Sequence, residues 1–158
     1  MRWLLIFLFF LLGLTPVLAA APIEGRVLKV LPQLFDKEGR NSKTPSLYDR
    51  DAYQAFLRLH PAEISALRFA VQWKAKAPES EPLRLRVEIR GMAQGLAQGE
   101  LPKETTLEQP VRQHHRFSHW ASVKLGAELY KKFGEVTAWR VTLWDGDRLL
   151  SEQKSFLW

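Results

Sequence analysis

Two stretches of this sequence alternate strictly between apolar and polar residues, and no other feature restricts the fold as much. The apolar positions are Leu67, Phe69, Val71, Trp73 and Ala75 in the first stretch and Leu83, Leu85, Val87 and Ile89 in the second. Successive side chains of a β-strand point to opposite faces, so each stretch predicts a strand with one apolar and one charged face. Because only the proline-containing segment 77–82 separates them, we expect the two strands to pair as an antiparallel hairpin.

Other segments carry further strand patterns. Residues 137–144 alternate in the same way, and Asp145-Gly146-Asp147 supplies a tight turn into 148–158, so a second hairpin is expected there. Additional strands are predicted over 26–31, 105–111 and 117–125. Pro110 has no backbone N–H to donate, which restricts the strand over 105–111 to the edge of a sheet.

One stretch has the period of a helix instead. Ser46 stands three residues before Asp49, which is the spacing of a helix cap, and Pro61 ends the run. The apolar residues between them are Tyr48, Ala52, Ala55, Phe56 and Leu59. This spacing predicts one helix of about three turns, packed by Phe56 and Leu59 over a sheet edge. A shorter helical turn is a candidate at 127–132.

Together these patterns predict a mainly β fold, an immunoglobulin-like antiparallel β-sandwich of six to eight strands with one short peripheral helix. The chain contains no cysteine, so the Cys-Trp-Cys pattern of antibody domains is absent and a disulfide-free core must hold the domain together. The resemblance is therefore one of architecture, and no functional residue can be inferred from it. A small outer-membrane β-barrel is the alternative, since its strands also alternate.

The first 20 residues have the layout of a secretory signal peptide. Arg2 precedes an apolar run over 3–14, Pro16 follows, and Ala19 and Ala20 provide small residues for cleavage. We expect a signal peptide over 1–20 and a single β-sandwich domain over 21–158, with no membrane span after cleavage and a periplasmic or secreted location. An uncleaved membrane anchor is the alternative interpretation.

Three clustered histidines are the most visible candidates for a metal site. His114, His115 and His119 lie close in sequence, but the flanking pattern is that of a strand. Four strand residues separate side chains by about 13 Å, which is too far for two ligands of one ion. We therefore expect no metal and no cofactor.

Motifs for catalysis are likewise missing from the sequence. It has no cysteine, no Gly-x-Ser-x-Gly and no glycine-rich phosphate loop. The pair Asp49 and Asp51 fits the first turn of a helix, and the pair Asp145 and Asp147 fits a turn. An enzyme whose site is assembled from dispersed His and Asp residues remains the alternative to a non-enzymatic protein.

The outward positions of the predicted strands suggest a binding surface. If the strands over 67–76 and 83–90 pair, one sheet face carries most of their charge, and two tryptophans also fall on the polar faces of their strands. The candidate residues are Arg68, Lys74, Lys76, Arg84, Arg86, Arg90, Trp120 and Trp144. Such a basic face attracts anionic surfaces. Because it lacks interleaved aromatic residues of the kind that stack on bases, nucleic acid is not expected as a partner.

The overall charge agrees with a surface of this kind. The chain has 23 Lys and Arg against 17 Asp and Glu, and Arg2 is the one charged residue in the first 20. This excess is mild and differs from a nucleic-acid-binding tail. The sequence thus predicts an exported, non-enzymatic interaction or envelope-structural module whose partner is an anionic envelope component or another protein.

Overall fold

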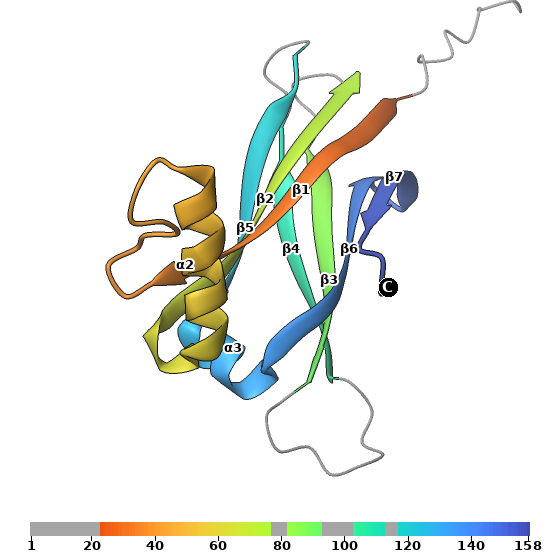
Figure 1. The fold of residues 1–158 in the computed structure, drawn as a ribbon. Coiled ribbons are helices and arrows are strands. Elements are labelled where there is room, and N and C mark those ends of the chain that lie inside the picture. Colours follow the sequence, from red (N-terminus) through yellow and green to blue (C-terminus); the bar gives the residue numbers. More distant parts are fainter. Residues whose placement is uncertain (1–22, 77–81, 93–102, 113–116) are drawn as a thin grey trace, which may run out of the picture.

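Two antiparallel sheets face each other in the computed structural model, which describes residues 23–76, 82–92, 103–112 and 117–158 (Figure 1). The first sheet contains β1 (Glu24–Asp36), β2 (Ile64–Lys76) and β5 (His119–Gly126) in the order β1-β2-β5. The second contains β3 (Leu83–Met92), β4 (Lys103–Val111), β6 (Glu135–Asp145) and β7 (Arg148–Lys154) in the order β4-β3-β6-β7. The predicted signal peptide lies outside the described residues.

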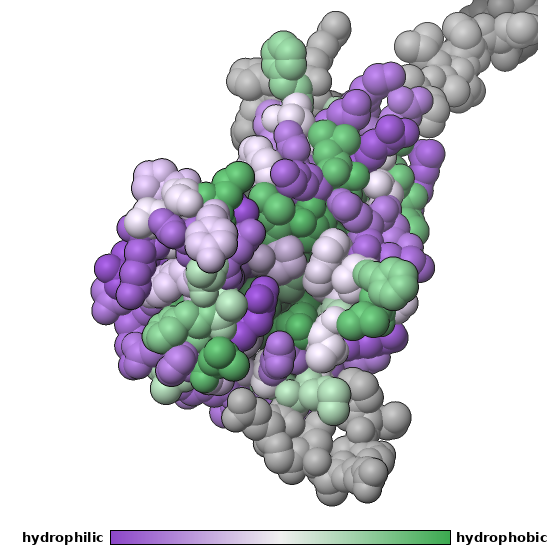
Figure 2. Space-filling model, in the orientation of Figure 1, coloured by the Kyte–Doolittle hydropathy of each residue, from purple (hydrophilic) through white to green (hydrophobic). Residues whose placement is uncertain are grey.

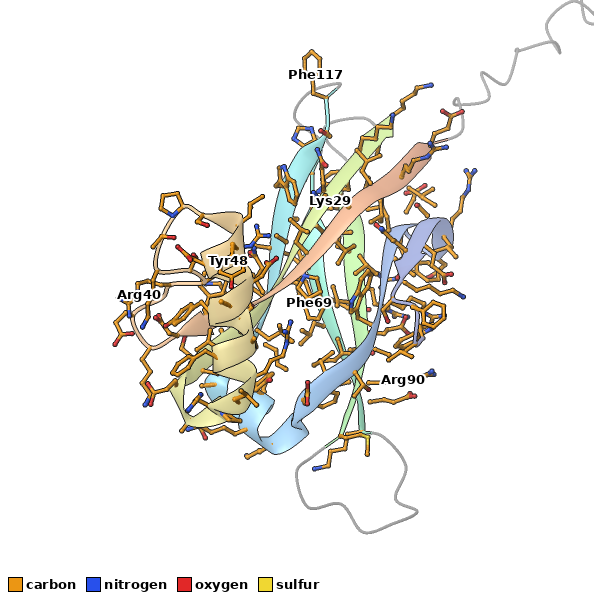
Figure 3. All side chains as sticks on the ribbon, in the orientation of Figure 1. Lys29, Arg40, Tyr48, Phe69, Arg90 and Phe117 are labelled. Atoms are coloured by element: carbon orange, nitrogen blue, oxygen red, sulfur yellow. The ribbon has the colours of Figure 1, made fainter. Side chains whose placement is uncertain are left out.

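The core lies between the sheets and is built by the residues that alternate. Phe69 and Val71 on β2 and Leu85, Val87 and Ile89 on β3 have no exposed surface at all. Phe69 is seen between the two layers in Figure 3. Burying a large apolar side chain stabilises a protein by roughly 1.5–3 kcal/mol, so these positions supply much of the stability of a chain without disulfides.

The strand order is that of an immunoglobulin-like sandwich. The chain passes from one sheet to the other after β2, after β4 and after β5, and β4 pairs with β3 rather than with β5, which gives sheets of three and four strands. The hairpin of β6 and β7 was predicted correctly, and its turn uses Gly146 at φ +53°. The edge position predicted from Pro110 is also confirmed, because β4 ends its sheet.

The hairpin predicted from the two alternating stretches is wrong. β2 pairs with β1 and β5, and β3 pairs with β4 and β6, so the two stretches belong to opposite sheets. Alternation shows which face of a strand is apolar, and two strands that face each other across a core have the same pattern as two that pair side by side. The charged faces of β2 and β3 therefore point to opposite sides of the molecule.

Two helices lie at one end of the sandwich: α2 (Leu47–Leu59), followed by a short 3-10 turn over Pro61–Glu63, and α3 (Ala127–Phe133) (Figure 1). The candidate turn at 127–132 is thus a second helix. α2 begins as predicted, because the hydroxyl of Ser46 accepts a hydrogen bond from the backbone N–H of Asp49. Among the described helices, none has the length and apolar character that crossing a membrane requires.

Helix α2 covers part of the free edge of β1. The Gln54 side-chain amide accepts from the Leu34 N–H at 2.8 Å and donates to the Leu34 carbonyl at 2.9 Å. The same amide nitrogen donates to the Asn41 carbonyl at 2.8 Å. An uncovered strand edge is a template for pairing with other chains, so these bonds both satisfy and protect β1.

The face by which α2 packs differs from the prediction. Tyr53, Gln54 and Leu57 are buried, whereas Phe56 and Leu59 are 40% and 79% exposed. The helix meets a strand edge whose groups are polar, so an amide faces inward there and the apolar stripe that dominates the sequence pattern turns outward.

Leu57 and Leu59 provide a direct test of this packing. Leu57→Ala should lower the free energy of unfolding by about 2–5 kcal/mol because its side chain is completely buried. Leu59→Ala, two positions along the same helix, should change it by less than about 0.5 kcal/mol. Chemical denaturation of both variants measures the difference, and a larger loss for Leu59→Ala would contradict the described orientation of α2.

Candidate functional site

The eight predicted surface residues are divided between the two sheets. Arg68, Lys74, Lys76 and Trp120 lie on the outer face of the β1-β2-β5 sheet. The other half of the set, Arg84, Arg86, Arg90 and Trp144, lies on the outer face of the opposite sheet. This division follows from the wrong hairpin prediction, and the two faces must be considered separately.

The outer face of the β4-β3-β6-β7 sheet, called the ion-pair face here, compensates its own arginines. Arg86 and Arg90 each place Nε 2.7 Å from a carboxylate of β4, Glu108 and Glu104 respectively. Arg84 lies 3.8 Å from Glu108. The register makes these pairs possible, because Glu108 and Glu104 stand directly across from Arg86 and Arg90.

At the centre of the ion-pair face, β3 and β6 are joined by a bidentate ion pair. Arg140 donates from Nε and Nη2 to the Glu88 carboxylate at 2.6 and 2.9 Å. These hydrogen bonds hold the pKa of Glu88 below its usual value, against the effect of partial burial. The Arg140 guanidinium also lies 5.1 Å from the ring of Trp158.

Tryptophans complete the ion-pair face rather than standing free. The Trp144 indole N–H donates to the Thr142 hydroxyl at 2.7 Å, and the Arg86 guanidinium lies 5.6 Å from the Trp144 ring. Arg90 lies 4.1 Å from the ring of Trp158. Half-buried arginines between carboxylates and aromatic rings form a face whose interactions are mostly internal.

The outer face of the β1-β2-β5 sheet has a different composition, and we call it the basic face. It carries six cationic side chains: Arg26, Lys29, Arg68, Lys74, Lys76 and Lys124. Across the described strands of this sheet, the single outward carboxylate is Glu24, which meets Lys76 at 3.0 Å. The basic face therefore keeps a large positive excess.

Most cations of the basic face have no ion pair with a described residue. Arg68 is held by other contacts, because its guanidinium lies 4.1 Å from the Phe35 ring and donates to Gln33. Lys29 and Lys124 are exposed and make no such contact with the described chain; Figure 3 shows Lys29 on β1. No residue that the structure describes pairs with these two charges.

Trp120 adds an exposed aromatic side chain to the basic face. It is 54% exposed, and in the strand register it stands in one row with Gln72 and Lys29. Gln72 donates to the Ser118 hydroxyl at 3.0 Å, so this row is ordered by a side-chain hydrogen bond. Trp120 thus shares a row with a cation that has no described ion-pair partner, whereas Trp144 lies among arginines that have carboxylate partners.

Sequence reasoning missed three cations of the basic face: Arg26, Lys29 and Lys124. Arg26 and Lys29 are three residues apart, so simple alternation assigns them to opposite faces of a strand. A β-bulge between Val27 and Lys29 shifts the register and brings both outward. Lys124 was within a predicted strand, and its relation to Arg68 required knowing that β5 pairs with β2.

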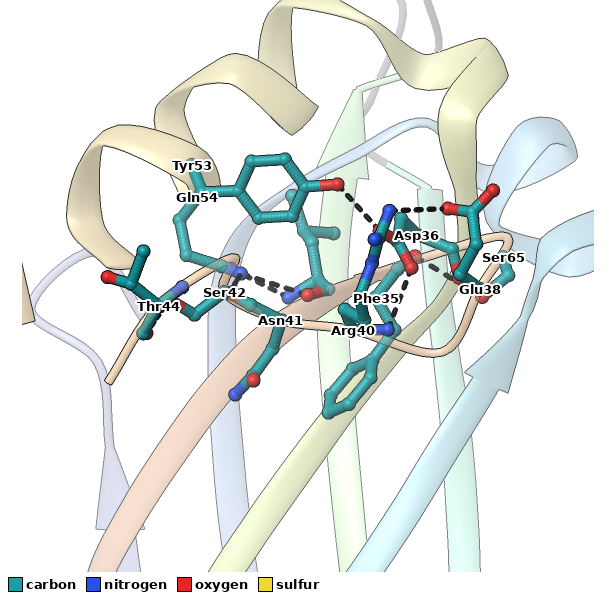
Figure 4. A network of polar contacts seen from close by, with 11 residues as sticks. Phe35, Asp36, Glu38, Arg40, Asn41, Ser42, Thr44, Tyr53, Gln54 and Ser65 are labelled. Atoms are coloured by element: carbon teal, nitrogen blue, oxygen red, sulfur yellow. Dashed lines mark hydrogen bonds and ion pairs between the residues drawn. The ribbon is translucent and has the colours of Figure 1, made fainter. Parts of the chain in front are cut away.

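A buried carboxylate lies away from both faces, at the end of β1 (Figure 4). Asp36 is 2% exposed and accepts hydrogen bonds from the Tyr53 hydroxyl at 2.6 Å, the Arg40 backbone N–H at 2.7 Å and Arg40 Nε at 2.9 Å. Burial alone would raise the pKa of Asp36, but these hydrogen bonds outweigh it and hold the pKa well below its usual value.

The partners of Asp36 indicate a structural role. Hydrogen bonding to Asp36, together with burial, raises the pKa of Tyr53, so the hydroxyl keeps its proton and the carboxylate keeps its charge at neutral pH. A base with a strongly lowered pKa is poorly suited to accept a proton near pH 7. The network instead ties the chain after β1 to helix α2.

Asp36→Asn should therefore lower stability and alter its pH dependence. Asp has a pKa near 3.9 when unfolded. Its folded-state pKa is lower, so the contribution of the charge is present above about pH 4 and is lost as the pH falls further. At pH 7 the substitution should cost roughly 3 kcal/mol, and it should flatten the acid side of the stability profile measured by denaturation.

Asp147→Asn makes the same chemical change at an exposed turn position and serves as the control. It should leave the acid dependence close to that of the unmodified protein. An Asp36→Asn variant with an unchanged profile would contradict the assigned role of the network.

The other titratable candidates are distributed over the fold. His119 begins β5, and its ring lies against Trp73 with centroids 5.4 Å apart. Asp49 and Asp51 lie at the start of α2, and Asp145 and Asp147 flank the β6–β7 turn, far along the chain from the first pair. His114 and His115 fall outside the described residues. Within the part of the chain that the structure describes, no group of three potential metal ligands is found.

Comparisons with known proteins add little to this description. No protein-family model matches the sequence, and no curated protein matches it. A crystal structure of an immunoglobulin-like protein from Pseudomonas aeruginosa aligns over 86% of this chain and 96% of that chain, with 16% identity and a TM-score of 0.37. The strand order described above, and not this likeness, identifies the fold as an immunoglobulin-like sandwich.

Proposed function

We propose that this protein is exported and acts without catalysis, as a β-sandwich module that binds an anionic component of the cell envelope through its basic face. The supporting observation is the contrast between the outer faces. Arginines of the ion-pair face have carboxylate partners, whereas Arg26, Lys29, Lys74 and Lys124 have none among the described residues.

Electrostatics gives this contrast a functional meaning. Six cations on one sheet face repel one another, which costs folding stability, and an anionic partner would remove that repulsion. A surface of this kind attracts polyanions and anionic lipid headgroups over distances of about 8 Å at physiological salt. The attraction adds up over several side chains and needs no deep pocket.

Export rests on the sequence of residues 1–20, whose charge, apolar run and alanines fit a cleaved signal peptide. The mature domain would then fold in a compartment where anionic lipids and polymers are abundant. A fold without cysteine suits such a compartment because it has no thiol to oxidise.

An acidic protein is the second candidate partner, favoured by Trp120. Large exposed aromatic residues are enriched at the centres of protein interfaces, and this one stands in the same row as Lys29. Trp120→Ala separates the candidates, because it should weaken protein binding strongly and binding to a simple polyanion little.

The proposal is tested with purified protein of residues 21–158, long-chain polyphosphate and vesicles containing an anionic lipid. The double variant Lys29→Gln with Lys124→Gln should weaken binding roughly 30-fold, since each cation near an anionic surface contributes about 1 kcal/mol. Raising the salt concentration should weaken binding further, with a shallower slope for the variant. Isothermal titration and vesicle sedimentation measure both effects.

The matched control removes two charges elsewhere, through Lys131→Gln with Lys154→Gln on α3 and β7. It should bind nearly as the unmodified protein does. Equal weakening in both double variants would mean that net charge alone governs binding, and binding that does not respond to salt would exclude the basic face as its site.

A further inference from the structure

A groove of about 640 Å³ opens at one end of the basic face, where β1 and β7 begin and β2 ends. This volume falls within the range of pockets that take small-molecule ligands. Its charged lining residues are Glu24, Arg26, Lys74, Lys76 and Arg148, and its remaining lining is mainly aliphatic. Figure 2 shows hydrophilic side chains gathered over this upper right part of the molecule.

Close contact between the two sheets creates the groove. A Cβ atom at Gly25 would lie 2.8 Å from Leu143 Cδ2 and 2.9 Å from Leu150 Cδ1, so a larger residue there would force these leucine side chains to shift. The Val27 N–H donates to the Ser151 hydroxyl at 3.0 Å and fixes the approach. As a result, Arg148 from the second sheet lines the same groove as cations of the first.

Among the described residues, the lining of the groove carries more positive than negative charge. Lys76 meets Glu24, but Arg26, Lys74 and Arg148 form no ion pair with any described residue. This holds for Arg148 even though Asp145 and Asp147 precede it in the turn. Within the described lining, four cations against one carboxylate leave a positive excess, which favours a ligand with more than one negative charge.

The arrangement of these cations also restricts the ligand. Arg26 stands directly across from Lys74, and Lys74 and Lys76 point to the same side of β2, about 7 Å apart along the strand. Guanidinium groups donate two parallel hydrogen bonds to oxyanions, and phosphoryl groups offer three acceptor oxygens and up to two charges. Arg26 and Arg148 line the groove from different sheets and Lys74 and Lys76 line it along β2, so the groove offers several cations to a ligand with linked phosphoryl groups.

We propose that this groove is the docking site for consecutive phosphoryl groups of an extended phosphate-bearing ligand, with Arg148 as a ligand-binding residue outside the basic face. The inference rests on the proposed function and makes it specific. It assigns the chemical class of the anion, and it places the first contact at the sheet junction rather than at the centre of the β1-β2-β5 sheet.

Arg148 allows the test to be separated from that of the basic face. Tripolyphosphate is titrated into protein of residues 21–158, with binding followed by calorimetry and by amide chemical shifts. Arg148→Gln should weaken binding at least about tenfold, as expected for loss of a charge-assisted hydrogen bond. Lys124→Gln, at the far end of the basic face, should change tripolyphosphate affinity less than about twofold.

Citrate, which carries three carboxylates, tests the chemical class. Citrate binding as tight as that of tripolyphosphate would overturn the assignment to phosphoryl groups. Thermal unfolding of Arg148→Gln provides the folding check, and the lining variant Arg26→Gln provides a second route to the same result. Unchanged tripolyphosphate binding in both folded variants would contradict the proposal that the groove is the binding site.

The outcomes distinguish this inference from the proposed function. Suppose that Lys29→Gln with Lys124→Gln weakens polymer binding while Arg148→Gln leaves tripolyphosphate binding unchanged. The proposed binding site in the groove is then wrong, and binding through the basic face is supported. If tripolyphosphate binds in an Arg148-dependent way but long-chain polyphosphate and anionic vesicles do not bind, the groove is supported and the envelope function is wrong.

Discussion

The apolar core between the two sheets, to which β2 and β3 contribute their inward side chains, determines how the rest of the molecule is arranged. With no disulfide in the chain, Phe69 and Val71 on one sheet and Leu85 and Val87 on the other must hold the layers together. Once these side chains are fixed inward, every intervening side chain is fixed outward. The polar surfaces of both sheets are therefore a geometric consequence of the core, and function can be placed on them without disturbing it.

Identical alternation nevertheless produced two unlike surfaces, because cross-strand neighbours decide what an outward charge does. The neighbour of β3 supplies Glu104 and Glu108, directly opposite Arg90 and Arg86. The neighbours of β2 supply Lys29 and Lys124 instead, and so add charge of the same sign. Two strands that are equally basic in sequence thus belong to one balanced and one unbalanced face.

Local features were predictable from the sequence and non-local ones were not. The strands, the edge position of Pro110 and the cap at Ser46 depend on neighbouring residues, and the sequence shows those directly. Sheet membership depends on contacts between residues far apart in the chain, so charged residues that were predicted to share one face are divided between the two sheets. The bulge after Val27 and the inward orientation of Gln54 likewise arise from tertiary contacts, which the hydrophobic periodicity of the sequence does not show.

The contact between Gln54 and Leu34 has a consequence for assembly. A primary amide presents a donor and an acceptor side by side, as a peptide group does, and here it takes the place that a further strand would occupy at that point of β1. A strand added to the sheet would itself have a free edge of unpaired backbone N–H and C=O groups, whereas a helix has no such edge. By capping this part of the β1 edge with a side chain, the molecule prevents edge-to-edge pairing of two copies at that point.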